Sequence, residues 1–157
     1  MKHKSYLTAI SRKTLPSPTR WLMKNGFVQN HPHIATLDFG CGKCHEVNNQ
    51  HFPADGYDPH YRPNGIPEGK RYNIIICNYV LCTLPKEERA AVLKKIQFFL
   101  SEHGVAYISV RNDKPKQGWG LSSKGTYQGR CEHVTDTMIY KNSQFRIYQL
   151  TKKTRLV

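Results

Sequence analysis

The sequence lacks an uninterrupted apolar run long enough to cross a membrane. Its longest apolar stretch, residues 72–84, is interrupted by Asn73 and Asn78, whereas a membrane-spanning helix needs about 20 apolar residues. The N-terminus carries basic residues but not the apolar segment of a secretory signal. We therefore expect no membrane association and no signal-directed export.

Cysteine is scarce and odd in number. The five cysteines show no spacing typical of a disulfide framework, so we expect a reducing, cytoplasmic location. Residues 41–45 match the C-x-x-C-H haem-attachment pattern, and the same residues with His51 could ligate zinc. Because haem attachment needs a secretory context, and because either group would disturb the glycine turn described below, we expect neither haem nor a metal.

Acidic residues are also few. The chain has 11 Asp and Glu against 24 Lys and Arg, a net charge of +13. Such an excess in a small domain favours a polyanionic partner, because counterion release favours binding to phosphate. The cations cluster near both ends of the chain and around residues 112–130. We expect DNA or RNA to bind this basic surface; the alternative is that the charge serves solubility or reflects a general basic bias.

The length of 157 residues predicts a single domain over 1–157, with a basic N-terminal arm at 1–15 and a basic loop at 112–130. Apolar and β-branched runs predict buried strands at 34–39, 54–58, 72–77 and 105–110. Capping residues and apolar periodicity predict helices at 17–26, 43–49 and from Pro85 to about 101.

Two further segments define the topology. Residues 59–70 hold three prolines and two glycines, so they predict a loop where another helix and strand would otherwise fit. Residues 134–140 and 145–151 predict a hairpin. Together the segments predict an α/β fold with a mostly parallel sheet, a C-terminal antiparallel hairpin and a shortened middle.

The most informative motif is a glycine turn after the first predicted strand, in which Asp38 and Phe39 are followed by Gly40, Cys41 and Gly42. Alternating glycines allow a tight turn and a close approach of the backbone to a ligand. An acid about twenty residues further on can bind the hydroxyls of a ribose. Asp58 has this spacing. The motif therefore predicts a cofactor that carries a nucleoside.

The acid before the first glycine argues against a dinucleotide. Asp38 would repel a pyrophosphate, and His45 stands where the dinucleotide fingerprint has its third glycine. A carboxylate suits a cofactor with a positively charged amino-acid end. Residues 38–42 resemble the first motif of class I S-adenosylmethionine-dependent methyltransferases, usually D/E-x-G-x-G-x-G, with Cys44 in place of the third glycine.

The resemblance implies the Rossmann-like fold of these enzymes, S-adenosylmethionine as cofactor and methyl transfer as activity. Asp38 would orient the ammonium group of the cofactor, Asp58 would bind the ribose and Pro59 would flank the adenine. Cys77, Asn78 and Tyr79 match the fourth motif of the family, which borders the methionine part. The implied cofactor site is therefore formed by Asp38, Phe39, Gly40, Cys41, Gly42, Asp58, Pro59, Cys77, Asn78 and Tyr79.

A general base is needed only if the methyl acceptor must lose a proton. Asp113, Tyr79, His60 and His133 are candidates, among which the sequence does not choose. Residues 58–61 resemble the D-P-P-Y box of amino-methylating DNA enzymes, but they follow the second strand and not the fourth-motif strand. The Pro-Cys nucleophile of cytosine-5 enzymes is absent after Ile76.

A closer resemblance covers most of the chain and points to the bacterial methyltransferases associated with DNA phosphorothioation. It is carried by residues 9–13, 18–20, 37–42, 56–61 and 123–128. It makes Arg12, Lys13, Lys124 and Tyr127 candidate contacts for the acceptor, which the basic excess indicates is a nucleic acid or nucleotide-like molecule. Arg111, at the start of the basic segment, is a further candidate contact. Two alternatives stay open: a non-catalytic nucleic-acid-binding module on this scaffold, and a methyltransferase acting on a small molecule.

Overall fold

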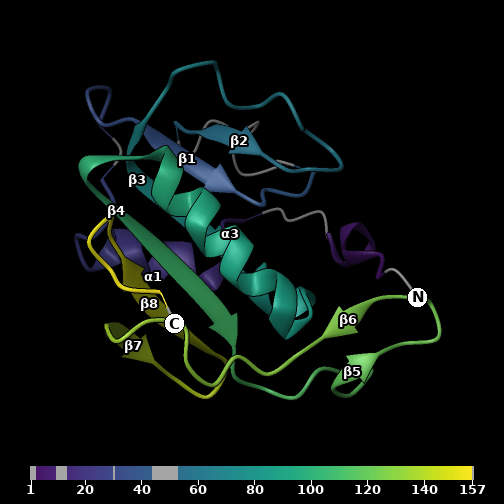
Figure 1. The fold of residues 1–157 in the computed structure, drawn as a ribbon. Helices are drawn as coiled ribbons and strands as arrows, with labels where there is room; N and C mark the ends of the chain where they lie inside the picture. Colours follow the sequence, from purple (N-terminus) through teal and green to yellow (C-terminus); the bar gives the residue numbers. More distant parts are fainter. Residues whose placement is uncertain (1–2, 10–13, 30, 44–52, 157) are drawn as a thin grey trace.

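The computed structural model describes residues 3–9, 14–29, 31–43 and 53–156. Its centre is a six-stranded sheet with the order β2-β1-β3-β4-β8-β7 (Figure 1). The strands β1 (Thr36–Phe39), β2 (Asp55–Tyr57), β3 (Tyr72–Asn78) and β4 (Leu100–Arg111) pair in parallel. The hairpin of β7 (Met138–Lys141) and β8 (Phe145–Leu150) joins β4 antiparallel. The predicted α/β fold and its C-terminal hairpin are confirmed.

Helices cover opposite faces of this sheet (Figure 1). Successive side chains of a strand point to opposite faces, and the neighbours Ile75 and Ile76 of β3 belong to two different apolar clusters. Ile75 packs in the cluster that contains Ile96 of α3 (Lys86–Phe99), whereas Ile76 packs in the cluster that contains Leu22 of α1 (Ser17–Lys24). The core therefore has three layers with the sheet in the middle.

The predicted shortening of the middle is also confirmed. The chain runs from β2 to β3 through turns, with an isolated bridge between Asp58 and Arg62. Gly65 lies directly on β2, since a Cβ built on it would come within 1.7 Å of the Gly56 carbonyl oxygen. This loop therefore covers β2, the last strand at that end of the sheet order.

The element boundaries differ from the prediction at two helices. Ser17 is the first residue of α1 and not its cap, which is Pro16; its hydroxyl accepts a hydrogen bond from Arg20 (3.0 Å). The predicted helix after Pro85 ends at Phe99, and β4 begins at Leu100 instead of Val105. Cross-strand pairing decides this start, because Leu100 already pairs with Tyr72 and the register then shifts.

The two basic segments have little regular structure. The arm contains the single 3₁₀ turn η1 (Ser5–Thr8), and the 112–130 loop contains a two-stranded antiparallel sheet of β5 (Gly120–Leu121) and β6 (Tyr127–Gln128). The predicted helix at 43–49 lies almost wholly outside the described residues. Across the described part of the chain, the helices are too short or too polar to cross a bilayer.

The described cysteines are of two kinds, one paired and three free. Cys41 is disulfide-bonded, whereas Cys77, Cys82 and Cys131 are buried free thiols. The spacing of the five cysteines alone did not reveal this pairing, because sequence distance does not report which sulfur atoms meet in the fold.

Candidate active site

A cleft opens at the carboxyl ends of the parallel strands, where ligands bind in open α/β sheets. Its volume is ≈ 1370 Å³, which exceeds the range of about 300–1,000 Å³ typical of small-molecule sites. The turns after β1, β2 and β3 form its floor, and the first turn of α3, the N-terminal arm and the segment after β4 form its walls. The cleft is therefore large enough for a cofactor and an acceptor together.

The glycine turn after β1 is held between its two neighbouring strands. Gly40 has a φ of 77° and lies so close to the turn after β3 that a Cβ would meet Val80 Cγ2 at 2.3 Å. On the other side, the backbone amides of Gly40 and Cys41 donate hydrogen bonds to the Tyr57 carbonyl at 2.7 and 3.0 Å. Only glycine permits both this conformation and this approach.

Asp58 joins the turn after β2 to the glycine turn. Its Oδ2 accepts a hydrogen bond from the Gly42 amide (3.0 Å), and its Oδ1 accepts from the amides of His60 (2.9 Å) and Tyr61 (3.0 Å). A carboxylate offers about four acceptor positions, so these three contacts leave Oδ2 able to accept a further donor. Asp58 is half-buried at the floor of the cleft.

A buried polar network supports the turn after β3. The amide nitrogen of Asn78 donates to Thr19 Oγ1 of α1 (2.7 Å), and its amide oxygen accepts from Ser109 Oγ of β4 (2.9 Å). The next residue, Tyr79, is the one non-glycine residue with positive φ among those described (59°), and its amide donates to the Ser109 carbonyl (3.0 Å). Strained backbone of this kind is retained when surrounding contacts fix it, and it concentrates at functional sites.

Arg111 and Asp113 form a two-point ion pair where the chain leaves β4. The guanidinium donates from Nε and Nη2 to the two carboxylate oxygens, each at 3.0 Å. This hydrogen bonding raises the pKa of Arg111 and lowers the pKa of Asp113. Both side chains line the cleft, so the pair presents fixed charges to whatever binds there.

The buried thiols near the cleft are poorly suited to act as nucleophiles. Burial raises the pKa of Cys77 and of Cys82 above the ordinary value of 9.0. The neutral thiol therefore predominates at neutral pH, and the thiolate is the reactive form. Among the described residues, no three His, Cys, Asp or Glu side chains gather as metal ligands would; Cys44, His45 and His51 of the zinc alternative lie outside these residues.

The structure brings most of the predicted cofactor residues together. The cleft is lined by Asp38, Phe39, Gly40, Cys41, Asp58, Pro59, Asn78 and Tyr79. Gly42 contacts Asp58 from just outside this lining. Cys77 is fully buried beneath the floor and does not line the cleft.

The predicted catalytic and acceptor residues are more scattered. Tyr79, His60, Asp113 and Arg111 line the cleft. His133 lies outside the lining and pairs with Asp136 (3.0 Å), with 60% of its side chain exposed. Lys124 and Tyr127 also lie outside the lining. Arg12 and Lys13 fall outside the described residues.

Several lining residues were not found from the sequence, namely His3, Lys4, Tyr6, Glu87, Glu88 and Gln128. The arm residues carry no periodic signal, and Glu87 and Glu88 were explained fully as acids in a first helical turn. Gln128 has a buried Oε1 without a hydrogen-bond partner among the described residues. Only the packing of the arm and of β6 near α3 and η2 (Leu81–Thr83) reveals their place in the cleft.

Solved structures confirm the Rossmann-like fold. The 1,6-didemethyltoxoflavin-N1-methyltransferase of Burkholderia thailandensis, solved with 1,6-didemethyltoxoflavin and S-adenosylhomocysteine, is 13% identical with a TM-score of 0.59, covering 85% of this chain and 76% of its own. PH0226 protein of Pyrococcus horikoshii is 11% identical with a TM-score of 0.54. A TehB-like SAM-dependent methyltransferase of Corynebacterium glutamicum is 17% identical with a TM-score of 0.51. For both, the alignment covers 83% of this chain and 85% of the other.

Sequence comparison gives the family. No curated protein sequence matches the chain. The sequence model described as "Methyltransferase domain" matches residues 13–144, a range that contains the glycine turn, Asp58 and the turn after β3. The chain belongs to this methyltransferase-domain family.

Proposed function

We propose that the protein is an S-adenosylmethionine-dependent methyltransferase that acts on a nucleic acid or a nucleotide-like acceptor. The observation that carries the proposal is the hydrogen bond between the Gly42 amide of the glycine turn and Asp58, at the floor of a cleft of ≈ 1370 Å³. A ligand bound at this point would contact both the backbone of the glycine turn and the Asp58 carboxylate. Bound S-adenosylmethionine would supply a methyl group on a positively charged sulfur.

The residues present suit this cofactor. Asp38 is buried (8% exposed) and lines the cleft at the end of β1, so its carboxylate can favour an ammonium group. Asp58 retains an acceptor position on Oδ2 for a ribose hydroxyl, as counted above. Pro59 follows at the exposed rim and offers a flat surface to an adenine.

The chain's contribution to the reaction is mainly placement. Holding two reactants in the reacting geometry supplies a large part of the acceleration of a displacement. The network of Asn78, Thr19 and Ser109 fixes the turn that carries Tyr79 into the cleft. Tyr79 would therefore stand between the cofactor floor and the acceptor side and orient the acceptor against the methyl group.

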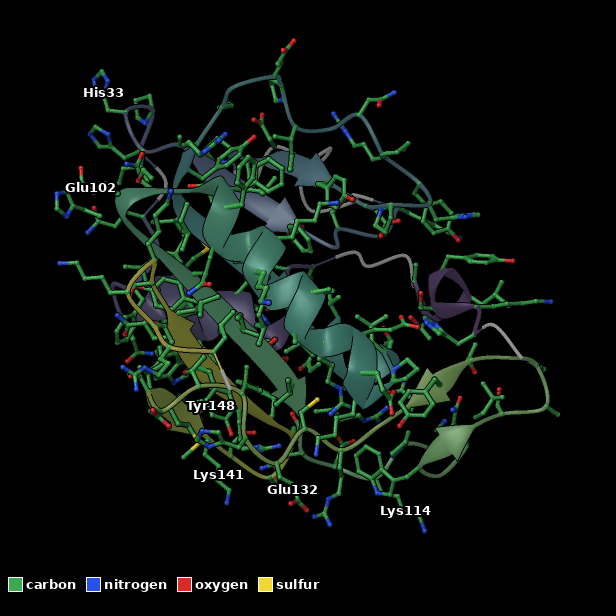
Figure 2. All side chains as sticks on the ribbon, in the orientation of Figure 1. His33, Glu102, Lys114, Glu132, Lys141 and Tyr148 are labelled. Atoms are coloured by element: carbon green, nitrogen blue, oxygen red, sulfur yellow. The ribbon has the colours of Figure 1, made fainter. Side chains whose placement is uncertain are left out.

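The charge distribution supports a polyanionic acceptor. Lys4 and Arg111 line the cleft, and the segment that leaves β4 carries further exposed cations. Figure 2 shows Lys114 and Lys141 extending away from the ribbon into solvent. A chain of net charge +13 attracts phosphate over distances near the Debye length. Lys124 and Tyr127 would also contact the acceptor.

We propose that residues 1–157 act as a single cytoplasmic domain, with the arm (1–15) and the 112–130 loop as its acceptor-binding extensions. We also propose a relationship to the methyltransferases associated with DNA phosphorothioation. Contacts between the arm and the loop support the first point, since the Lys4 amide donates to the Gly125 carbonyl (2.7 Å).

Calorimetric titration with S-adenosylhomocysteine tests the cofactor site. The wild type should bind in the micromolar range, and Asp58→Ala should abolish detectable binding because it removes the ribose acceptor and the tie to Gly42. Asp136→Ala, which removes an exposed carboxylate outside the cleft lining, is the matched control. A flat titration with folded wild-type protein would refute the proposal.

Transfer of a labelled methyl group to separate pools tests the acceptor. The pools are DNA, transfer RNA, ribosomal RNA and a metabolite extract. Label in a nucleic acid, inhibited by salt, supports the proposal. Label only in the metabolite extract means a small-molecule enzyme. Salt-sensitive nucleic-acid binding without any transfer means a non-catalytic module.

A further inference from the structure

A histidine and a glutamate meet in the wall of the cleft although they are 85 residues apart in the sequence. His3 lies in the N-terminal arm and Glu88 in the first turn of α3, and both line the cleft. His3 Nε2 and Glu88 Oε2 are 2.7 Å apart. Only 13% of the His3 side chain is exposed, against 51% for Glu88.

This contact fixes which imidazole nitrogen carries the proton. An ionised carboxylate can only accept a hydrogen bond, so Nε2 is the donor and Nδ1 of the neutral ring keeps its lone pair. Nδ1 is buried and has no hydrogen-bond partner among the described residues. Buried polar atoms are almost always paired, so one without a partner calls for an explanation. Because His3 lines the cleft, a small shift of the arm would expose Nδ1 to an acceptor molecule, which would supply the missing partner.

The arm is anchored on both sides of the cleft by residues that follow His3, so the ring does not depend on Glu88 alone for its position. On one side, the Lys4 amide donates to the Gly125 carbonyl (2.7 Å). On the other, Tyr6 stacks on His60 with 3.9 Å between ring centroids, and Tyr61 Oη donates to the Tyr6 carbonyl (3.1 Å). The arm therefore crosses the mouth of the cleft from the basic loop to the turn after β2.

We propose that His3 is the general base of the methyl transfer and that Glu88 is its positioning residue. The inference rests on the proposed methyltransferase function and restricts its acceptor to a group that bears an O–H or N–H proton. The acceptor oxygen or nitrogen forms a bond to the methyl carbon as the bond from sulfur to that carbon breaks. Sulfur keeps the electron pair and becomes a neutral thioether. The acceptor proton passes to His3 Nδ1, the imidazolium then carries the positive charge, and water later takes the proton.

Two of the other candidate bases, His60 and Asp113, are less free to act. The ring of His60 stacks on Tyr6 and meets Tyr61 edge to face, and both carboxylate oxygens of Asp113 accept hydrogen bonds from Arg111. The remaining charged groups that line the cleft are Lys4 beside His3 in the arm, Glu87 and Lys95 on α3, and Asp38 and Asp58 on the floor. Of the described histidines that line the cleft, only His3 combines a carboxylate partner with a buried nitrogen that lacks a hydrogen-bond partner.

The test compares His3→Ala, Glu88→Gln and the control His103→Ala, which changes an exposed residue of β4 outside the cleft lining. With the acceptor pool that the wild type labels best, His3→Ala should lower kcat by about 10²–10⁴-fold, and added imidazole should restore part of the loss. Glu88→Gln should lower kcat less, because an amide oxygen still accepts from Nε2. His103→Ala should match the wild type.

Two further measurements do not depend on activity. Imidazole ¹⁵N spectra of the wild type should show His3 protonated at Nε2 and unprotonated at Nδ1, and this preference should weaken in Glu88→Gln. Affinity for S-adenosylhomocysteine should be the same in His3→Ala and the wild type. Undiminished kcat in His3→Ala, a proton on Nδ1 of the neutral ring, or equal losses of cofactor affinity and kcat would each overturn the assignment. Failure of the base alone leaves wild-type transfer intact, whereas a wild type that transfers no methyl group overturns both proposals.

Discussion

Gly40→Ala should destabilise the protein by more than its backbone conformation alone accounts for. Gly40 has a φ of 77°, and an alanine in the left-handed region costs about 1–2 kcal/mol. The new Cβ would also lie 2.3 Å from Val80 Cγ2, and relieving such an overlap in a packed region costs about 1–3 kcal/mol. The free energy of unfolding should therefore fall by about 2–5 kcal/mol.

Gly26→Ala separates these two costs. Gly26 has nearly the same φ, 78°, but no atom lies within 4 Å of a Cβ built on it. The free energy of unfolding of this control should fall only by the cost of placing alanine in the left-handed conformation, about 1–2 kcal/mol. Its affinity for S-adenosylhomocysteine should be unchanged, because Gly26 lies outside the cleft lining.

Urea unfolding of both variants measures the difference between their losses of stability. A double variant tests whether the extra loss in Gly40→Ala comes from the contact with Val80. In a Val80→Ala background the Cγ2 methyl is absent, so Gly40→Ala should cost less there than in the wild type. Calorimetry should show weaker binding of S-adenosylhomocysteine to Gly40→Ala, since the turn must move away from Val80. Equal losses of stability in Gly40→Ala and Gly26→Ala, or no coupling between Gly40 and Val80, would refute the close approach of the two turns.

Two further outcomes follow from buried groups. Asn78→Ala should cost about 1–3 kcal/mol in urea unfolding for each hydroxyl left unsatisfied, because Thr19 and Ser109 both lose their partner; a loss under 0.5 kcal/mol would contradict the network, given its burial. Burial raises the pKa of Cys131 from 9.0 to about 11. The stability from this group is complete below pH 9 and is lost as the pH rises through 11, at about 1.4 kcal/mol per pH unit. Between pH 8 and pH 10 the free energy of unfolding, measured from unfolding curves, should fall less for Cys131→Ala than for the wild type. An equal fall in both proteins would show that Cys131 does not contribute to the pH dependence of stability.

The sequence was sufficient to predict local structure where a single residue type determines the backbone conformation. Proline and glycine in residues 59–70 rule out a helix whatever surrounds them, so the shortened middle was predictable. The turn around Gly40 was predictable for a similar reason, since few other residues tolerate positive φ. Asp58 followed from its spacing, because two adjacent parallel strands end at the same edge of the sheet.

The sequence misled where pairing outweighed local preference. Residues 100–104 resemble the end of a helix, but Leu100 pairs with Tyr72 and already belongs to β4. Gly104 accompanies this irregular start: a Cβ on it would lie 2.5 Å from the Tyr72 carbonyl oxygen. Cys77 followed the same pattern, since its place in the motif suggested contact with the cofactor, while the sheet buries it completely.

By itself, therefore, the sequence determined the sheet, the glycine turn and the acid that completes it, because these depend on backbone conformation and on short, regular spacings. Tertiary structure alone decided which distant side chains share the cleft. The arm has no periodic pattern, and nothing within it indicates that His3 meets Glu88. That contact depends on how the arm crosses the mouth of the cleft between the turn after β2 and the basic loop, and such long-range geometry is a property of the packed chain and not of any local segment.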